Sequence, residues 1–376
     1  MQRHLFTVIR VLLVVIGVTV IALAVNWQTV LVVPAGTPGP GGAMSDVSQT
    51  FGIDTLTSAG PDVVLVTTDA GLTGEFSESM IQPGLFTVFS TADWRWLLLG
   101  LALVGCVYPL QATRWWILMR CRGLSATWRR TLRLVLVGAF CNFFLPGTEG
   151  GDVVKAWGAA KGTDRRVEAV ISVVFDRITG LAGLVILAAV VGIFVAESEK
   201  AQQIGWWVGW AMGGIGLAAI IAFVLATRDW LRMPEVARTF GGGLPARVID
   251  AAMAYASHPT AVLSATGVSV LVQVLLASAA GCAAWSLGVT HDLTVILAVM
   301  PILFLVAAVP LIWQGAGVME LAGIALLVGS GAASVNQVVG LLLIYRALEF
   351  TWGGVGALLM LGGGIELHPP QQKAVP

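Results

Sequence analysis

Apolar residues occur in long runs that are separated by short polar segments. A helix needs about 20 mainly apolar residues to cross a bilayer, and several runs reach that length. They lie at 5–25, 96–119, 170–196, 204–226, 261–287 and 335–361. The pattern therefore predicts an all-α fold, a polytopic integral membrane helical bundle with about six full spans.

Two further apolar regions are interrupted by polar or helix-breaking residues. The region 134–145 has only about a dozen residues and ends at Pro146, and the region 293–331 contains Pro301 and Pro310. Non-helical backbone at membrane depth is tolerated where it is buried in protein or lines a polar cavity. We therefore predict two broken or re-entrant hairpins, one entering from each side, which line a cleft between the halves of the bundle.

The distribution of basic residues predicts the topology. The stretch 26–93 is rich in Gly, Pro, Ser and Thr and has no Lys or Arg, whereas 114–133 and 228–247 are rich in Arg. Lys and Arg are enriched in cytoplasmic loops, so 26–93 is predicted to be extracytoplasmic, with a small hairpin formed by 63–68 and 72–76. Both termini are then cytoplasmic. The predicted parts are an N-terminal transmembrane helix (1–25), an extracytoplasmic polar loop (26–93), a multi-helix membrane domain (94–363) and a cytoplasmic tail (364–376).

Composition narrows the function. Hydrophobic residues make up 57% of the chain and charged residues 11%, which excludes a water-soluble fold, and a formal net charge of +0 gives no reason to expect nucleic acid as a partner. The cysteines and histidines have no metal-ligand spacing, and no phosphate-binding loop or nucleophile elbow is present. We therefore predict no metal, no cofactor and no catalytic residue.

The first interrupted region contains the most informative motif. Asn142 and Glu149 are costly at membrane depth unless they are used, and the segment between them allows a tight backbone turn. Asp152 is placed to cap the helix that follows, with Lys155 one turn later. The alternative is an ordinary interfacial loop followed by a capped helix.

Two more sets of ionisable residues lie in apolar segments. Asp176 and Arg177 are adjacent, about 100° apart on a helix, so they are expected to reach separate partners; alternatively both lie at the interface, with Arg177 reaching out of the membrane. Arg346 and Glu349 share one face of the last span and can pair, or Arg346 can meet Glu320. An Arg in a bundle interior suits a phosphate group, although purely structural pairing is the competing interpretation.

These motifs together resemble the flippase-like membrane region of the lysylphosphatidylglycerol synthetase family. The residues that carry the resemblance are Arg114-Trp115, the segment 142–156, Asp176-Arg177 with Gly180, the segment 315–320 and Arg346. The resemblance covers about Asp93 to the last helix and implies the handling of a phospholipid, with movement between leaflets. The chain departs from the family pattern at Lys155 and Met319, where relatives usually carry Arg.

We therefore expect a protein of the cytoplasmic membrane that binds, and moves across the bilayer, a phospholipid or lipid-linked headgroup. The residues expected to bind it are Asn142, Pro146, Gly147, Glu149, Gly150, Gly151, Asp152, Lys155, Asp176, Arg177, Gln314, Gly315, Gly317, Glu320, Arg346 and Glu349. Two alternatives remain: a membrane-embedded transferase that acts on lipid-linked substrates, and a non-catalytic lipid-binding partner of a separate membrane enzyme.

Overall fold

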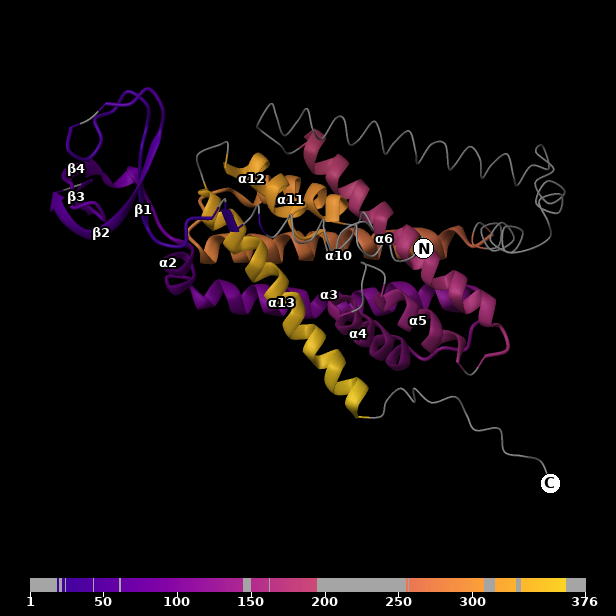
Figure 1. The fold of residues 1–376 in the computed structure, drawn as a ribbon. Helices are drawn as coiled ribbons and strands as arrows, with labels where there is room; N and C mark the ends of the chain where they lie inside the picture. The colour runs from indigo at the N-terminus through magenta and orange to yellow at the C-terminus, as the bar shows by residue number, and fades with distance from the viewer. Residues whose placement is uncertain are drawn as a thin grey trace, which may run out of the picture. The chain divides into compact units, whose positions relative to one another are not determined.

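The chain is mostly helical (Figure 1), and in the part that the structure describes four helices are long and apolar enough to cross a membrane. The computed structural model describes residues 19, 22–23, 25–42, 44–60, 62–144, 150–161, 163–194, 255, 257–307, 315–328 and 333–362. The candidate spans are α3 (Trp94–Cys121), α6 (Arg166–Phe194), α10 (Pro259–Ser286) and α13 (Val335–Leu361). They confirm four predicted spans. The span predicted at 204–226 falls outside the described residues, as does most of the span predicted at 5–25.

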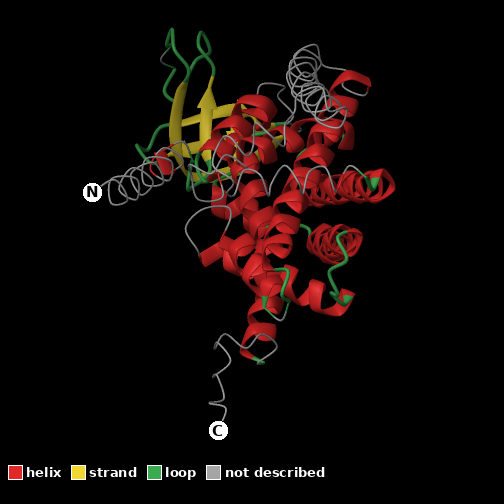
Figure 2. Ribbon diagram, turned by 90° about the vertical axis from the view of Figure 1, so that its right-hand side faces the viewer, coloured by secondary structure: helices red, strands yellow, loops and turns green. Residues whose placement is uncertain are grey.

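The stretch that follows the first predicted span folds as a β-sheet. Its strands are β1 (Val30–Val33), β2 (Gln49–Gly60), β3 (Val63–Thr68), β4 (Thr73–Ser77) and β5 (Ile81–Gln82), with a short 3-10 helix, η1 (Glu78–Met80). The strands form one antiparallel sheet in the order β4-β3-β2-β1-β5 (Figure 2). The predicted β3–β4 hairpin is confirmed, and the other three strands lie in a stretch that was predicted only as a polar loop; its extracytoplasmic position stays a prediction.

Alternation of side chains gives the sheet its own small core. Successive residues of a strand point to opposite faces, and alternate positions Leu31 and Val33 of β1 and Val64 and Val66 of β3 are buried together with Phe76. We call residues 30–82 the sheet domain. Its core is formed only by apolar side chains of its own residues.

Contacts along the chain divide it into two compact units. The first unit comprises 1–97, 282–291 and 316–345, and the second comprises 98–281, 292–315 and 346–376. The first unit therefore contains the sheet domain, α2 (Leu85–Ser90), α12 (Val318–Leu327) and the first part of α13.

One buried amide on α13 holds both ends of the sheet domain. Asn336 is 2% exposed, and its Oδ1 accepts a hydrogen bond from the Asn26 backbone N–H at 3.0 Å. Its Nδ2 donates to the carbonyl oxygens of Asn26 at 2.9 Å and of Pro83 at 2.8 Å. Val25, Leu85 and Val339 pack around this joint. The chain thus enters and leaves the sheet domain at one fixed point.

In the second unit, α4 (Trp128–Phe144) and α5 (Gly150–Ala160) pack closely against each other. A Cβ atom on Gly151 would lie 2.1 Å from the carbonyl oxygen of Gly138, so glycine is required for this approach. Helix α4 begins six residues earlier than the predicted apolar segment, because its first turns carry Arg129, Arg130 and Arg133 and are too polar for a hydropathy pattern to include. The turn between α4 and α5, at 145–149, falls outside the described residues.

Another described helix of the second unit, α11 (Leu293–Ala307), packs against α6. Leu187 and Val191 of α6 and Ala298 of α11 form a buried cluster. The predicted second broken hairpin corresponds to α11 and α12, which are separate helices as expected, but they belong to different units. The insertion of either hairpin into a membrane stays a prediction.

Candidate functional site

A buried carboxylate joins three helices of the second unit. Asp176 on α6 has a side chain that is 3% exposed, and its Oδ1 accepts from Arg114 Nε of α3 at 2.7 Å. Its Oδ2 accepts from Lys155 Nζ of α5 at 3.2 Å. A buried charge is tolerated when it is paired and hydrogen-bonded. Asp176 therefore holds α3, α5 and α6 together.

A second carboxylate extends this arrangement. Asp152 on α5 is 3.0 Å from Lys155 Nζ, and its Oδ2 accepts from Arg177 Nε at 2.8 Å. Exposure of the side chains rises from 3% at Asp176 to 38% at Arg177. We call Arg114, Asp152, Lys155, Asp176 and Arg177 the charge network. It leads from a buried end to an accessible one.

The charge network confirms one prediction about geometry and corrects another. Asp176 and Arg177 reach separate partners, as their adjacent positions on α6 require, and they tie α5 to the bundle. Asp152 does not cap α5. Its carboxylate contacts Lys155 and Arg177, and the Gly151 backbone N–H in the first turn instead donates to Asn142 Oδ1 at 2.7 Å. Asn142 of α4 therefore accepts a hydrogen bond from a backbone N–H at the N-terminus of α5, where the first N–H groups have no partner within the helix.

Small residues on α6 make room for Arg114. A Cβ atom on Gly180 would lie 3.0 Å from Arg114 Nη1, and a Cβ atom on Gly183 would lie 2.5 Å from the Cβ of Ser269 on α10. This close approach brings Ser269 Oγ within 3.3 Å of Arg114 Nη1. Gly180 therefore leaves space for the guanidinium, and Gly183 allows its contact with Ser269.

Arg114 and Ser269 are site residues that the expected binding set does not include, although Arg114 is one of the residues that carry the family resemblance. Arg114 was grouped with the cytoplasmic basic cluster, but it is 7% exposed and lies nearly two turns before Arg120, the basic residue in the last turn of α3. That distance from the end of an apolar run was the available signal. Ser269 is one of many small residues in α10, and no sequence signal distinguished it from the others.

The remaining predicted residues lie elsewhere. Glu320, in the first unit, is 3% exposed, and its Oε2 accepts from the Gly317 backbone N–H at 2.7 Å, which caps α12. Gly315 and Gly317 adopt positive φ angles of 67° and 90°. Arg346 and Glu349 lie on the part of α13 that belongs to the second unit. Pro146, Gly147, Glu149 and Gln314 fall outside the described residues. Convergence of all these side chains on one cleft stays a prediction.

Comparison with known proteins identifies the family of the chain. The model of the lysylphosphatidylglycerol synthase TM region matches residues 84–356, which include the described helices from α2 to α12 and most of α13 and exclude the sheet domain. No curated protein matches the sequence. The match covers well over half of the chain and contains the whole charge network. The protein therefore belongs to the lysylphosphatidylglycerol synthase TM-region family, and is a multi-pass membrane protein involved in lipid metabolism or transport.

Proposed function

We propose that the protein binds the phosphate of a phospholipid headgroup at the charge network and moves the lipid between leaflets. The observation that carries this proposal is a cluster of cations whose exposure rises toward one end. Arg114, Lys155 and Arg177 contact the carboxylates of Asp152 and Asp176, and the side chain of Arg177 is 38% exposed. Accessible cations in a mostly apolar chain suit an anionic phosphate, which a lipid headgroup supplies.

The two ends of the charge network suit different tasks. Asp176 is buried and has two cationic partners, so it is suited to hold the helices together. Asp152 and Arg177 are more accessible, so a ligand from outside can take the place of Asp152 beside Arg177. A phosphate oxygen can replace the Asp152 carboxylate between Lys155 and Arg177, because guanidinium groups bind carboxylate and phosphate with the same fork. Exchange of one oxyanion for another avoids leaving either cation unpaired at any stage.

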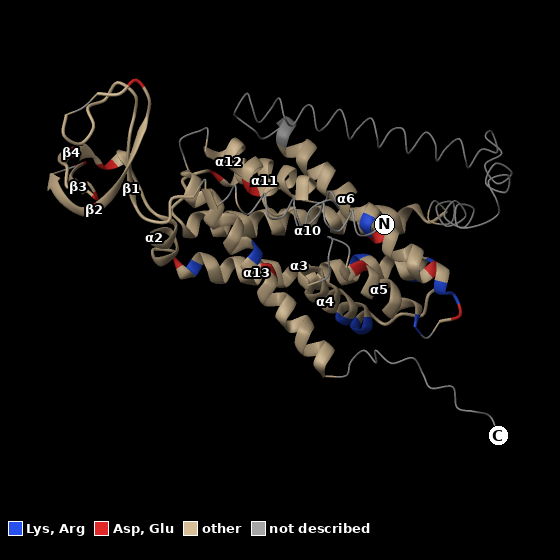
Figure 3. Ribbon diagram, viewed as in Figure 1, with Lys and Arg blue, Asp and Glu red and all other residues tan. Residues whose placement is uncertain are grey.

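Other residues complete the proposed route. Asn142, Gly150 and Gly151, with Pro146, Gly147 and Glu149, form the gate on the basic side, where Lys and Arg gather on α4 and near the start of α6 (Figure 3). Gln314, Gly315, Arg346 and Glu349 of the second unit contact the headgroup at another stage of its movement, and so, separately, do Gly317 and Glu320 of the first unit. The basic side faces the cytoplasm of a cell membrane, as do both termini, and the sheet domain is extracytoplasmic. The lipid moves down its own concentration gradient, or its movement is coupled to that of an ion.

Leaflet transfer in liposomes tests the proposal. The full-length chain is reconstituted with fluorescent phosphatidylglycerol, and a quencher that does not cross the bilayer reports the fraction of labelled lipid in the outer leaflet over time. Arg177→Gln is compared with Arg165→Gln. Both arginines pair with a carboxylate, but Arg165 lies outside the charge network and is paired with Glu168 at 3.4 Å on the surface. We expect at least tenfold slower transfer for Arg177→Gln and parental transfer for Arg165→Gln.

Other outcomes identify the alternative functions. A covalently altered lipid, detected by mass spectrometry in the parent, would instead support a membrane-embedded transferase. Absence of transfer in the parent, with lipid still bound, would support a non-catalytic partner of a separate membrane enzyme. Equal slowing by the two substitutions would remove the charge network from the proposed site.

A further inference from the structure

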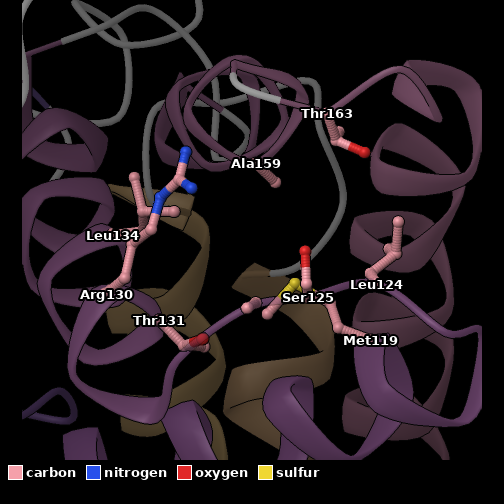
Figure 4. Close-up of a pocket in the computed structure, with 9 residues that line it drawn as sticks. Met119, Leu124, Ser125, Arg130, Thr131, Leu134, Ala159 and Thr163 are labelled. Carbon is pink, nitrogen blue, oxygen red and sulfur yellow. The ribbon is translucent and has the colours of Figure 1, made fainter.

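The basic end of the second unit contains a hollow that the charge network does not use. Its lining combines hydroxyl groups, one guanidinium and apolar side chains (Figure 4). The lining residues are Met119, Leu124, Ser125, Ala126, Arg130, Thr131, Leu134, Ala159 and Thr163. Such a mixture is typical of sites that bind a polar group beside an apolar one.

The end of α3 forms one wall of this hollow. Gly123 has a φ of 68°, its backbone N–H donates to the carbonyl oxygen of Arg120 at 2.9 Å, and the Leu124 N–H donates to that of Met119 at 3.1 Å. This is the Schellman motif, which glycine favours because an L side chain is strained at positive φ. It turns the chain sharply, so that Leu124 and Ser125 line the hollow.

Arg130 is held in place by the end of α5. Its Nη2 donates to the carbonyl oxygens of Gly158 at 2.8 Å and of Lys161 at 2.5 Å. A cation at a helix C-terminus is favourable because it meets carbonyl groups that have no partner within the helix. The guanidinium is thus fixed beside the hollow, and a ligand need not order it.

Hydrogen-bond donors around the hollow remain available. A guanidinium has five N–H donors, and the contacts that the structure records for Arg130 use only Nη2. Thr163 Oγ1 accepts from the Arg165 N–H at 3.1 Å and still has its own hydrogen to donate. The Ser125 hydroxyl has no hydrogen bond to any residue in the described part of the chain. Donors without acceptors favour an anionic oxygen.

The surroundings place this anion at headgroup depth. Arg129 and Arg133 flank Arg130 in the sequence of α4, and the carbonyl oxygen of Lys161 is bonded to Arg130. The acidic residues that follow Thr163 in the sequence are Asp164 and Glu168, of which Glu168 is paired with Arg165. Trp128 and Trp157, on the flanking helices, are 36% and 40% exposed. Exposed Trp beside Lys and Arg marks the membrane–water interface.

We propose that Arg130, Ser125 and Thr163 form a second binding site, for a phosphate group, on the basic end of the second unit. The apolar wall of Leu124, Leu134 and Ala159 accommodates the glycerol backbone or the first methylene groups of a lipid that carries the phosphate. The site goes beyond the proposed function, because it does not involve the charge network. It serves either a lipid headgroup or free phosphate, which share this chemistry.

Binding to the purified full-length chain in detergent tests this site. Dioctanoyl phosphatidic acid, dioctanoyl phosphatidylglycerol, inorganic phosphate and dioctanoylglycerol are titrated, and binding is followed by calorimetry. The test variant is Ser125→Glu, which places a carboxylate in the hollow without removing a recorded hydrogen bond. The control is Ser79→Glu in the sheet domain, which is also an exposed serine. A second variant, Arg130→Lys, keeps the charge but removes the planar fork.

We expect dioctanoyl phosphatidic acid to bind at least tenfold more tightly than dioctanoylglycerol. We expect Ser125→Glu to weaken that binding at least tenfold, Arg130→Lys to weaken it less, and Ser79→Glu to leave it unchanged. Competition by millimolar inorganic phosphate would identify free phosphate as an occupant, and binding of the lipids without such competition would identify the headgroup. Equal binding of dioctanoylglycerol, or parental binding by Ser125→Glu, would overturn the site. Leaflet transfer that fails while this binding persists would refute only the proposed function.

Discussion

Asn142 accepts the backbone N–H of Gly151 across the break between α4 and α5. Replacement by Ala leaves this N–H, which belongs to a buried glycine, without its acceptor. An unsatisfied buried donor costs about 1–3 kcal/mol, so we expect Asn142→Ala to lower the free energy of unfolding by about that amount. Thermal unfolding in detergent measures the change. Asn142→Asp keeps an acceptor near a helix N-terminus and should remain close to the parent; an equal loss in both variants would contradict this role.

Asp176 is predicted to be the most sensitive position in the charge network. Asp176→Asn removes the charge that Arg114 and Lys155 share, and breaking a buried pair costs about 3–5 kcal/mol. The matched control is Glu168→Gln, which breaks an exposed pair with Arg165 and should cost about 0–1 kcal/mol. Unfolding in detergent distinguishes the two. A double variant, Asp176→Asn with Arg114→Gln, should recover part of the loss, and purely additive effects would count against direct coupling.

Close packing of α6 on α10 predicts opposite effects for two glycines. A Cβ atom on Gly183 would lie 2.5 Å from Ser269 Cβ and 2.7 Å from its backbone carbon, whereas one on Gly267 of α10 would meet nothing within 4 Å. Overpacking costs about 1–3 kcal/mol, so Gly183→Ala should destabilise the protein. Gly267→Ala should be neutral or stabilising by up to about 1 kcal/mol, because Ala favours the helix. The midpoint temperature of thermal unfolding measures both effects. A shift in the same direction for both variants would contradict the prediction.

Asn336 is predicted to control how firmly the sheet domain is attached. Asn336→Leu removes the hydrogen bonds to Asn26 and Pro83, each worth about 1 kcal/mol. We expect faster hydrogen exchange and proteolysis at 25–29 and 83–87, with the sheet itself still protected. Gln337→Leu is the control, because Gln337 contacts Ser334 and Leu287 instead. Unchanged exchange at both ends of the sheet would show that the apolar contacts alone hold the joint.

Hydropathy predicted the long helices well because span length is a property of the segment itself. The predicted span 335–361 has the bounds of α13, and 261–287 differs from α10 by two residues at one end and one at the other. Hydropathy could not predict α4 in full, since its first turns are Arg-rich. Most of the sheet was also missed. The sequence predicted the β3–β4 hairpin but not the equally local β2–β3 pairing, and β1 pairs with residues about twenty positions away in β2.

The site was predicted in part, for a similar reason. Sequence identified Asn142, Asp152, Lys155, Asp176 and Arg177 because polar residues in apolar segments need partners. It could not identify Arg114 as the partner of Asp176, because 62 residues separate them. It likewise assigned Asp152 to the helix cap, since spacing along one helix cannot show that a residue from α4 reaches the same N-terminus first.

The joint at Asn336 also makes the sheet domain separable. Its entry and exit, at Asn26 and Pro83, are bonded to the same side chain, so a linker of a few residues can bridge them without moving a helix. The family match begins only after this joint, at residue 84. The sheet domain is therefore an exchangeable module, which can be excised or replaced by a reporter while the membrane helices keep their connections.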